Sequence, residues 1–301
     1  MSNISGKTKI LLDSYFSIPK ATILKSQKSK DGTIKNAITL YDKLVVECVL
    51  IPCKKRTTAC ISSQVGCSLD CNFCGTSKIE RKRNLTPDEI VDQVQIIHNQ
   101  SEENFDMPLR NIVFMGMGEP LMNYKNVMSA INKITSPKGI NISPKRITLS
   151  TSGIPKMIQK LADDRAKFNL AVSLHSADEK TRNTIMPFSK SFPLEELKLA
   201  LQYWYSKTKN RVTYEYIIWK GVNDNSEAIN SLVKFCKYVP CKVNIIEYNT
   251  IGDSSFTNAN EHITKQYISS LEQNNITVKI RKSRGDDIDA ACGQLANRST
   301  L

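Results

Sequence analysis

The sequence predicts an α/β fold, a partial (β/α)6 TIM-like barrel preceded by a short N-terminal extension. From Thr86 onward, apolar runs of strand length alternate with segments of helical periodicity. This alternation is typical of a parallel sheet with right-handed crossovers. Six strand–helix units follow one another without a glycine-rich dinucleotide fingerprint, which favours a barrel over a doubly wound sheet. We expect residues 1–43 to form a reduced N-terminal extension and residues 44–301 to form the core.

The extension is polar and rich in lysine. It predicts a short helix near Ile10–Tyr15 and then an edge hairpin that turns at Asp31-Gly32, a dipeptide common in tight hairpins. Residues 44–52 and 57–64 are rich in β-branched side chains and predict the next two strands.

The barrel begins with a clear helix start at residues 86–89, which read Thr-Pro-Asp-Glu. Thr86 suits the N-cap, Pro87 suits the first helical turn, and Glu89 is placed to complete a capping box. Strands are predicted after this helix at 111–115, 146–150, 169–174, 211–219, 242–249 and 276–282. Helices are predicted between them at 126–134, 155–161, 193–206, 226–238 and 260–273.

Composition limits the class of protein. The chain has 301 residues, is 40% hydrophobic and carries a net charge of +13, which favours a polyanionic partner such as nucleic acid. There is no apolar run of membrane-spanning length and no signal-peptide pattern, so we expect a cytoplasmic protein without a membrane partner. The basic side chains form three groups, which are the lysines within 20–35, Lys78 with 81–83, and Lys279 with 281–284.

Three of the nine cysteines lie within eight residues, at Cys67, Cys71 and Cys74. In a reducing compartment this C-x3-C-x2-C spacing indicates metal ligation rather than disulfides. A full iron–sulfur set has four cysteines, so three leave one iron open, as catalytic metal sites keep an open position. A structural zinc site with Cys53 or Cys60 as the fourth ligand is the alternative.

Phe73 before the third cysteine completes a pattern that resembles the signature of the radical S-adenosylmethionine (SAM) superfamily. Other motifs resemble a narrower family, the RlmN/Cfr RNA methyltransferases, and are closer to RlmN. They run in order from about Leu44 to Leu295 and read SSQVGCSLDCNFC, RNLTPDEI, FMGMGEPL, SLHS, GVND and RGDDIDAACGQL.

The resemblance implies a radical SAM barrel and two cofactors. Cys67, Cys71 and Cys74 would ligate a 4Fe–4S cluster whose open iron binds SAM. Matching positions imply SAM contacts at Gly118, Glu119, Ser150, Ser173, Leu174, His175 and Asn249. Several of these follow predicted strands, and barrel ligands bind at the carboxyl ends of strands. Taken singly, each residue is equally compatible with a turn or a helix cap.

The resemblance also implies three catalytic residues. Cys292 would be the methyl carrier: one SAM methylates its thiolate, and a 5′-deoxyadenosyl radical from a second SAM activates the S-methyl group, so that two SAM are used per turnover. Cys60 would be the resolving cysteine, which attacks the Cys292 sulfur and leaves a disulfide. Glu47 would be a proton acceptor.

The implied reaction is methylation of adenosine C2 in RNA, in the peptidyl-transferase loop of 23S rRNA and/or at tRNA position 37. The resemblance further implies an electron donor such as flavodoxin, and we expect a monomer. The chain departs from the family at Gly75-Thr76-Ser77-Lys78, usually Ala-Thr-Gly-Lys, and in its short N-terminus. Methylation of C8, a different substrate, or a non-catalytic metal-containing RNA-binding protein therefore stay open as alternatives.

Overall fold

The computed structural model describes residues 4–15, 20–252 and 256–297. Within these ranges ten strands form one curved sheet in the order β1-β2-β3-β4-β7-β8-β9-β10-β11-β12. Neighbours from β1 to β4 are antiparallel, and neighbours from β4 through β7 to β12 are parallel. The bounds are β1 Thr22–Lys28, β2 Ile34–Thr39, β3 Val45–Cys53, β4 Arg56–Cys60, β7 Leu109–Phe114, β8 Ile147–Thr151, β9 Asn169–Ser173, β10 Val212–Ile217, β11 Cys241–Ile246 and β12 Thr277–Arg281.

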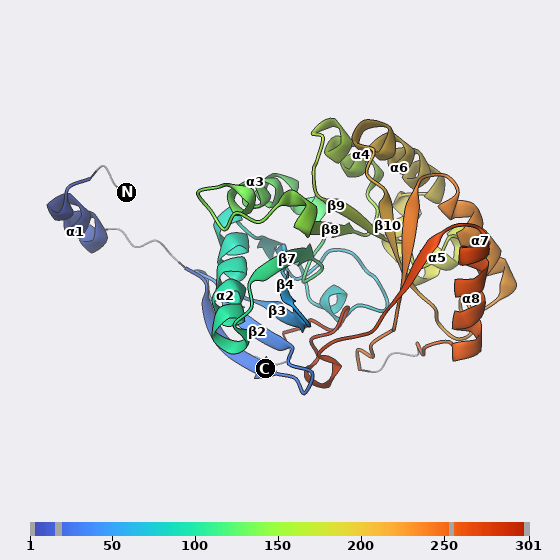
Figure 1. The fold of residues 1–301 in the computed structure, drawn as a ribbon, viewed down its shortest axis with the longest axis horizontal. Coiled ribbons are helices and arrows are strands. Elements are labelled where there is room, and N and C mark those ends of the chain that lie inside the picture. Colours follow the sequence, from blue (N-terminus) through green and yellow to red (C-terminus); the bar gives the residue numbers. More distant parts are fainter. Residues whose placement is uncertain (1–3, 16–19, 253–255, 298–301) are drawn as a thin grey trace.

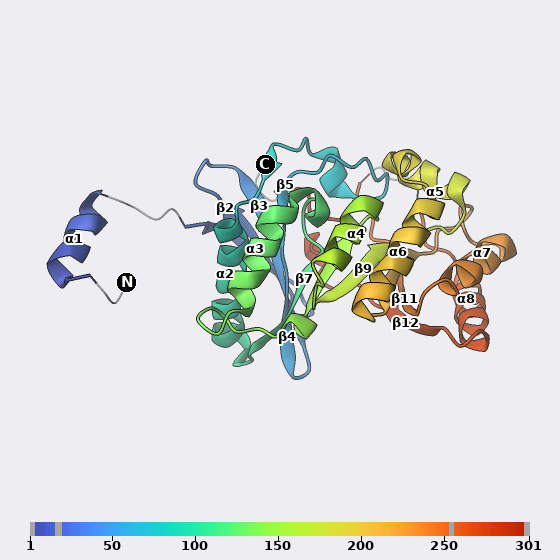
Figure 2. The same cartoon turned by 90° about the horizontal axis from the view of Figure 1, so that it is seen from above.

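Helices α2 to α8 lie on the outer side of the curved sheet (Figures 1 and 2). In the view of Figure 1 the segments that follow β4 and β12 lie inside the curve, and Figure 2 shows the segment after β4 at one end of the strands. The α-helices are α1 Gly6–Tyr15, α2 Pro87–Phe105, α3 Tyr124–Thr135, α4 Pro155–Asp163, α5 Glu179–Ile185, α6 Leu194–Thr208, α7 Ser226–Cys236 and α8 Glu261–Gln273. Six strand–helix units therefore run from β4 to α8, and β12 follows them. This confirms the predicted partial (β/α)6 barrel. No helix in the described ranges combines the length and apolarity needed to cross a bilayer.

Two apolar clusters hold the fold together. The larger one lies between the sheet and its helices, where side chains such as Ile112, Leu149 and Leu201 are almost fully buried. The smaller one joins the cysteine segment to the carboxyl ends of the strands, and it includes Cys71 and Trp219. Burial of apolar area at about 25 cal/mol per Å² is the main stabilising contribution of such clusters.

Candidate active site

The three clustered cysteines lie on a segment between β4 and α2 that is closed at its base. The two-stranded sheet of β5 (Gln64–Val65) and β6 (Arg83–Asn84) pairs its ends in antiparallel register. Cys71 is buried, and Cys67 and Cys74 are partly exposed. All three thiols are free and lie in the smaller apolar cluster. The short sheet therefore holds three unpaired thiols in one loop.

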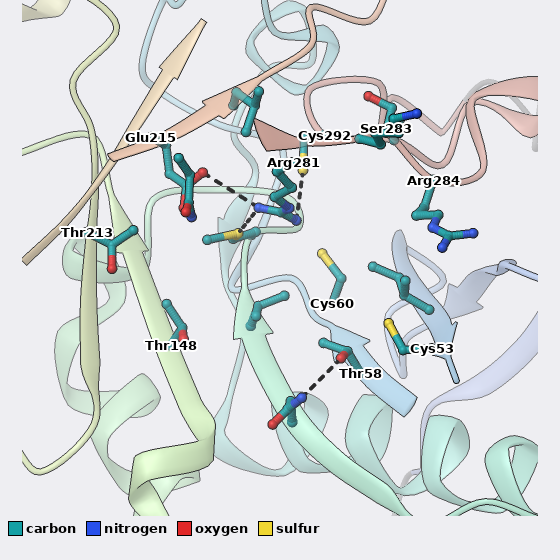
Figure 3. Close-up of a pocket in the computed structure, with 18 of the residues that line it drawn as sticks. Cys53, Thr58, Cys60, Thr148, Thr213, Glu215, Arg281, Ser283, Arg284 and Cys292 are labelled. Carbon is teal, nitrogen blue, oxygen red and sulfur yellow. Dashed lines mark hydrogen bonds and ion pairs between the residues drawn. The ribbon is translucent and has the colours of Figure 1, made fainter. Parts of the chain in front are cut away.

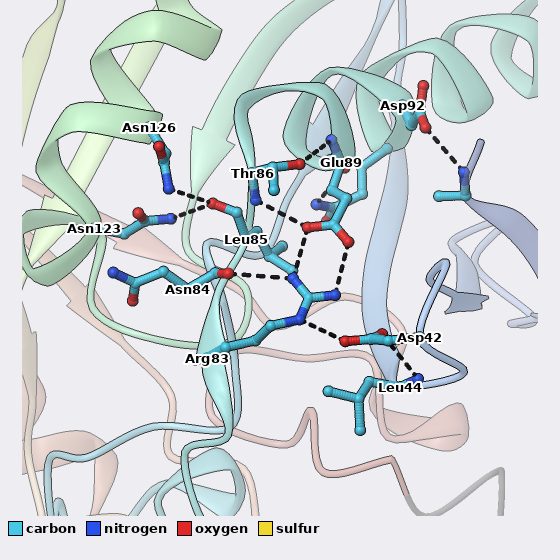
Figure 4. A network of polar contacts seen from close by, with 12 residues as sticks. Asp42, Leu44, Arg83, Asn84, Leu85, Thr86, Glu89, Asp92, Asn123 and Asn126 are labelled. Atoms are coloured by element: carbon cyan, nitrogen blue, oxygen red, sulfur yellow. Dashed lines mark hydrogen bonds and ion pairs between the residues drawn. The ribbon is translucent and has the colours of Figure 1, made fainter. Parts of the chain in front are cut away.

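Arg83 fixes the exit of this loop to helix α2 (Figure 4). Its guanidinium donates to both carboxylate oxygens of Glu89 at 2.8 Å and to Asp42 at 2.6 Å. Glu89 also accepts the amide of Thr86, whose hydroxyl in turn caps the Glu89 amide, so the predicted capping box is confirmed. The hydrogen bonds that Arg83 donates to Glu89 and Asp42 raise the pKa of Arg83. Arg83, which belongs to the basic group at 78–83, therefore forms ion pairs within the fold.

Burial dominates the electrostatics of the three thiols. It raises the pKa of Cys67 to about 12 and also raises the pKa of Cys71 and Cys74. Metal ligation requires the thiolate form, so binding would release protons. In the described part of the chain no three Cys, His, Asp or Glu side chains converge on a site for a single ion. The donor set instead fits an iron–sulfur cluster, which takes one thiolate on each of several irons.

A cavity of about 150 Å³ lies beside these thiols at the carboxyl ends of β7, β8 and β9. It brings together eight of the residues expected at the site, which are Cys71, Cys74, Gly118, Glu119, Ser150, Ser173, His175 and Cys292. Leu174 is buried behind this cavity, and its amide donates to the Glu215 carbonyl at 3.1 Å. Cys67 and Asn249 do not line the cavity.

The turn after β7 places a buried carboxylate in this cavity. Glu119 Oε1 accepts the amide of Leu121 at 3.0 Å, and Oε2 accepts the amide of Ser152 at 2.7 Å. Burial raises the pKa of Glu119, against these hydrogen bonds. Gly118 precedes it with φ +92°, and a Cβ there would lie 2.4 Å from the Gln64 side chain. Glycine is therefore required for the turn to pack against the cysteine segment.

An aromatic contact docks the cysteine loop on the barrel. The ring of Phe73 packs edge-on against His175 with 4.7 Å between centroids, and it lies 5.1 Å from the ring of Trp219. His175 is buried with φ +55°, and its Nδ1 accepts the amide of Ile217 at 3.3 Å. Burial, with the charge of Arg182 adding to it, lowers the pKa of His175 to about 3, so the imidazole is neutral at pH 7.

Arg182 is a site residue that the sequence analysis missed. It is almost fully buried on α5 and donates to three carbonyls, those of Ser173 at 3.0 Å, Ser152 at 2.7 Å and Leu174. Burial lowers the pKa of Arg182 to about 10. The guanidinium thereby ties together the chain that leaves β8 and the chain that leaves β9. A single arginine in a short polar helix has no sequence pattern that marks this role.

A second cavity, of about 730 Å³, lies inside the barrel and is shown in Figure 3. Cys60 and Cys292 both line it, and their sulfur atoms point into it. Burial raises the pKa of Cys60 to about 12, and Cys292 contributes to this shift. Cys292 lines both cavities, as do Met115, Glu215 and Arg281, so this residue lies where the two cavities adjoin.

Two further side chains hold the Cys292 region. Arg281 Nη2 donates to Cys292 Sγ at 3.5 Å, and its Nη1 lies 3.7 Å from Glu215 Oε2. Cys292 is the largest cause of the raised pKa of Arg281. Asn249, expected to contact SAM, lines the second cavity and donates to the Cys292 carbonyl at 3.1 Å.

Glu47 lies apart from both cavities. Its side chain is fully buried on β3, and its Oε2 accepts the amides of Ala296 at 2.9 Å and Asn297 at 3.0 Å. The carboxylate therefore contacts the segment that follows Cys292 rather than Cys292 itself.

Comparison with known proteins identifies the family of this chain. The Radical SAM superfamily model matches residues 61–233. The chain is 64% identical to a Christiangramia forsetii protein named probable dual-specificity RNA methyltransferase RlmN, over 99% of this chain and 85% of that protein. It is 39% identical to the Marinobacter nauticus dual-specificity RNA methyltransferase RlmN, over 99% and 82%. The crystal structure of a radical SAM methyltransferase from Sphaerobacter thermophilus superposes with a TM-score of 0.92 at 34% identity, covering 98% of this chain and 86% of that one. The chain therefore belongs to the radical SAM superfamily and, within it, to the RlmN family of dual-specificity RNA methyltransferases.

Proposed function

We propose that this chain is a radical SAM RNA methyltransferase that methylates C2 of adenosine, in 23S rRNA and/or at tRNA position 37, with Cys292 as the methyl carrier. Its relatives are named dual-specificity RNA methyltransferases. The observation that carries the mechanistic part is the position of Cys292 at the junction of two cavities. One cavity adjoins the clustered cysteines, and the other contains Cys60.

The residues present fit the two implied cofactors. Cys67, Cys71 and Cys74 would hold a 4Fe–4S cluster through their thiolates, and the adjoining cavity would hold SAM. When bound, cluster and SAM would supply a methyl group and one-electron chemistry, with two SAM consumed per turnover. Carboxylates pair well with ammonium groups, which supports Glu119 as the group that receives the SAM amine. Gly118, Ser150, Ser173, Leu174, His175 and Asn249 would form or support the remaining SAM site.

The chain's own sulfur atoms would carry the methyl group. The Cys292 thiol loses its proton and becomes a methyl thioether. After the carbon has bonded to adenine, it bridges Cys292 and the base. The Cys60 thiolate then attacks the Cys292 sulfur and forms a Cys60–Cys292 disulfide. The electron pair of the broken carbon–sulfur bond stays on the carbon, which takes up a proton and becomes the methyl group. Glu47 would act as proton acceptor in the role implied by its match. Two observations support this pairing: Cys60 and Cys292 line one cavity, and the charge of Cys292 acts on the Cys60 thiol.

The larger cavity supports RNA as the substrate. At the amino ends of the strands it is lined by four cationic side chains, which are Arg56, Lys145, Arg146 and Lys242. Phosphate groups are attracted to such side chains, and a target adenine must leave its stack to reach a sulfur inside a barrel. We therefore expect the RNA to lie across this end of the barrel. The protein would act as a cytoplasmic monomer with an electron donor such as flavodoxin.

Mass spectrometry of nucleosides from rRNA and tRNA tests the proposal. A strain that lacks the gene should lose 2-methyladenosine, the wild-type gene should restore it, and Cys292→Ala should not. If the deletion strain lost 8-methyladenosine instead, the methylated atom would be C8. If its RNA were unchanged, the methyltransferase assignment would be wrong. Cys60→Ala should accumulate a covalent protein–RNA adduct. A variant that methylates Cys292 but forms no adduct would remove the resolving role from Cys60.

A further inference from the structure

The segment that carries Cys292 lies against the N-terminal strands (Figure 1). In the turn between β1 and β2, Ser29 Oγ donates to Asp287 Oδ1 at 2.6 Å, and the Lys30 amide donates to Asp287 Oδ2 at 3.1 Å. Asp31 Oδ2 accepts the amide of Gly285 at 3.1 Å. The hairpin turn therefore holds the chain just before Cys292.

A buried ion pair continues this contact across β2 and β3. Lys35 and Glu47 are 3% and 0% exposed, and Lys35 Nζ lies 3.5 Å from Glu47 Oε1. Lys35 Nζ also donates to the Asp289 carbonyl at 3.4 Å, before Cys292. Glu47 Oε2 accepts the amides of Ala296 and Asn297, after Cys292. One ion pair thus bonds to the backbone on both sides of the exposed cysteine.

Stability alone does not explain why the Lys35–Glu47 ion pair is buried here. Removing two charges from water costs free energy, and a buried pair is often no more stabilising than apolar residues of the same size. A charged group that accepts or donates several backbone hydrogen bonds does, however, fix the geometry of the chain it contacts. Here Lys35 and Glu47 fix the segment from Asp289 to Asn297.

We propose that Lys35 and Glu47 are positioning residues that clamp residues 289–297, so that the Cys292 sulfur stays at the junction of the two cavities. This inference rests on the proposed function only in that Cys292 is the methyl carrier. This positioning role of Glu47 is separate from its proposed role as proton acceptor, and it rests on contacts: one carboxylate oxygen faces Lys35 and the other accepts two amides.

Hydrogen exchange on the full chain tests the clamp. Glu47→Gln keeps the shape of the side chain and removes its charge, and Lys35→Met removes the cation. A charge-assisted hydrogen bond contributes enough that its loss should speed exchange at Ala296 and Asn297 by about tenfold or more. Glu261→Gln is the matched control, because it breaks an exposed pair with Lys265 on α8. Exchange in β10, which is buried throughout, reports global unfolding in the same samples.

Faster exchange at 296 and 297, beyond any change in β10, would support the clamp. Unchanged exchange in both Glu47→Gln and Lys35→Met would overturn it. Intact mass after reconstitution gives a second readout, the fraction of Cys292 that becomes methylated. The clamp predicts that both variants slow this first step, whereas a Glu47 that served as proton acceptor alone would leave the rate of this step unchanged. If wild-type Cys292 is never methylated, the proposed function fails, and the exchange data still decide the clamp.

Discussion

The amide of Gly75, the residue after the third clustered cysteine, donates to the carbonyl of Gly293, the residue after Cys292, at 2.6 Å. The next residue repeats the contact, because Thr76 Oγ1 donates to the Leu295 carbonyl at 2.6 Å. Two hydrogen bonds therefore join the cysteine loop to the Cys292 segment, one from a backbone amide and one from a side-chain hydroxyl.

Thr76→Val should remove the hydrogen bond between the cysteine loop and the Cys292 segment while it keeps the shape of the side chain. Thr76 is 4% exposed, so valine would leave the Leu295 carbonyl without its donor in a buried setting. We expect a loss of about 1–3 kcal/mol in the free energy of unfolding. Urea denaturation measures it, and Thr264→Val, which loses an exposed hydroxyl contact on α8, should change little. Equal effects of the two substitutions would contradict this reading.

Gly118→Ala should distort the turn that carries Glu119. Its Cβ would meet the Gln64 side chain at 2.4 Å, and φ is already +92°. Gly221 has φ +72° with open space around it, so Gly221→Ala isolates the backbone cost, about 1 kcal/mol. We expect Gly118→Ala to lose at least about 1–3 kcal/mol more, the usual range for overpacking. Equilibrium unfolding compares the two variants, and equal losses would show that the contact with Gln64 is unimportant.

Arg182→Met should loosen the carboxyl ends of β8 and β9. Three carbonyls, those of Ser152, Ser173 and Leu174, would lose a charged donor, and we expect a cost of more than about 3 kcal/mol. Arg182→Lys should recover only part of it, because an ammonium lacks the planar fork that reaches carbonyls on both sides. Thermal unfolding of both variants checks the order. Full recovery by lysine would mean that charge alone matters.

Local patterns explain which elements the sequence could predict. The capping box at Thr86 and the period of the apolar residues act over a few positions, and they place α2 and the parallel strands to within a few residues. Helix α5, with the sequence EKTRNTI, was missed because it is short and polar. Its stability comes from an Asp178 cap and from the burial of Arg182, and only the second of these depends on the tertiary fold.

The same distinction holds for the site. The motifs predicted most residues of the cavity beside the clustered cysteines, because each motif is continuous in sequence. By contrast, the hydrogen bonds that hold the Glu47 carboxylate come from the amides of Ala296 and Asn297, about 250 positions away in the sequence. No local sequence pattern predicts such contacts. Arg83 and Arg281 counted as members of basic groups in the sequence. In the fold Arg83 binds Glu89 and Asp42, and Arg281 faces Cys292 and Glu215, so these two cations are used within the fold.

Acid should release the hairpin turn from the Cys292 segment. Burial alone would raise the pKa of Asp31, but hydrogen bonds from Thr33, Gly285 and Ser29 lower it below its usual 3.8. Because the folded-state pKa is the lower one, Asp31 contributes stability in full above pH 3.8, and this contribution is lost as pH falls through the folded-state value. The side chain is 28% exposed, so we expect no more than about 1 kcal/mol.

Urea unfolding of wild type and Asp31→Asn across this range measures the effect. The two proteins should differ at pH 7 and converge as the solution becomes acidic, because protonation removes from wild type the same charge that the substitution removes. The Gly285 amide should exchange faster in Asp31→Asn at neutral pH, since it loses a charged acceptor 3.1 Å away. A difference in unfolding free energy that stays constant down to the lowest pH would show that Asp31 acts through its shape and not through its charge.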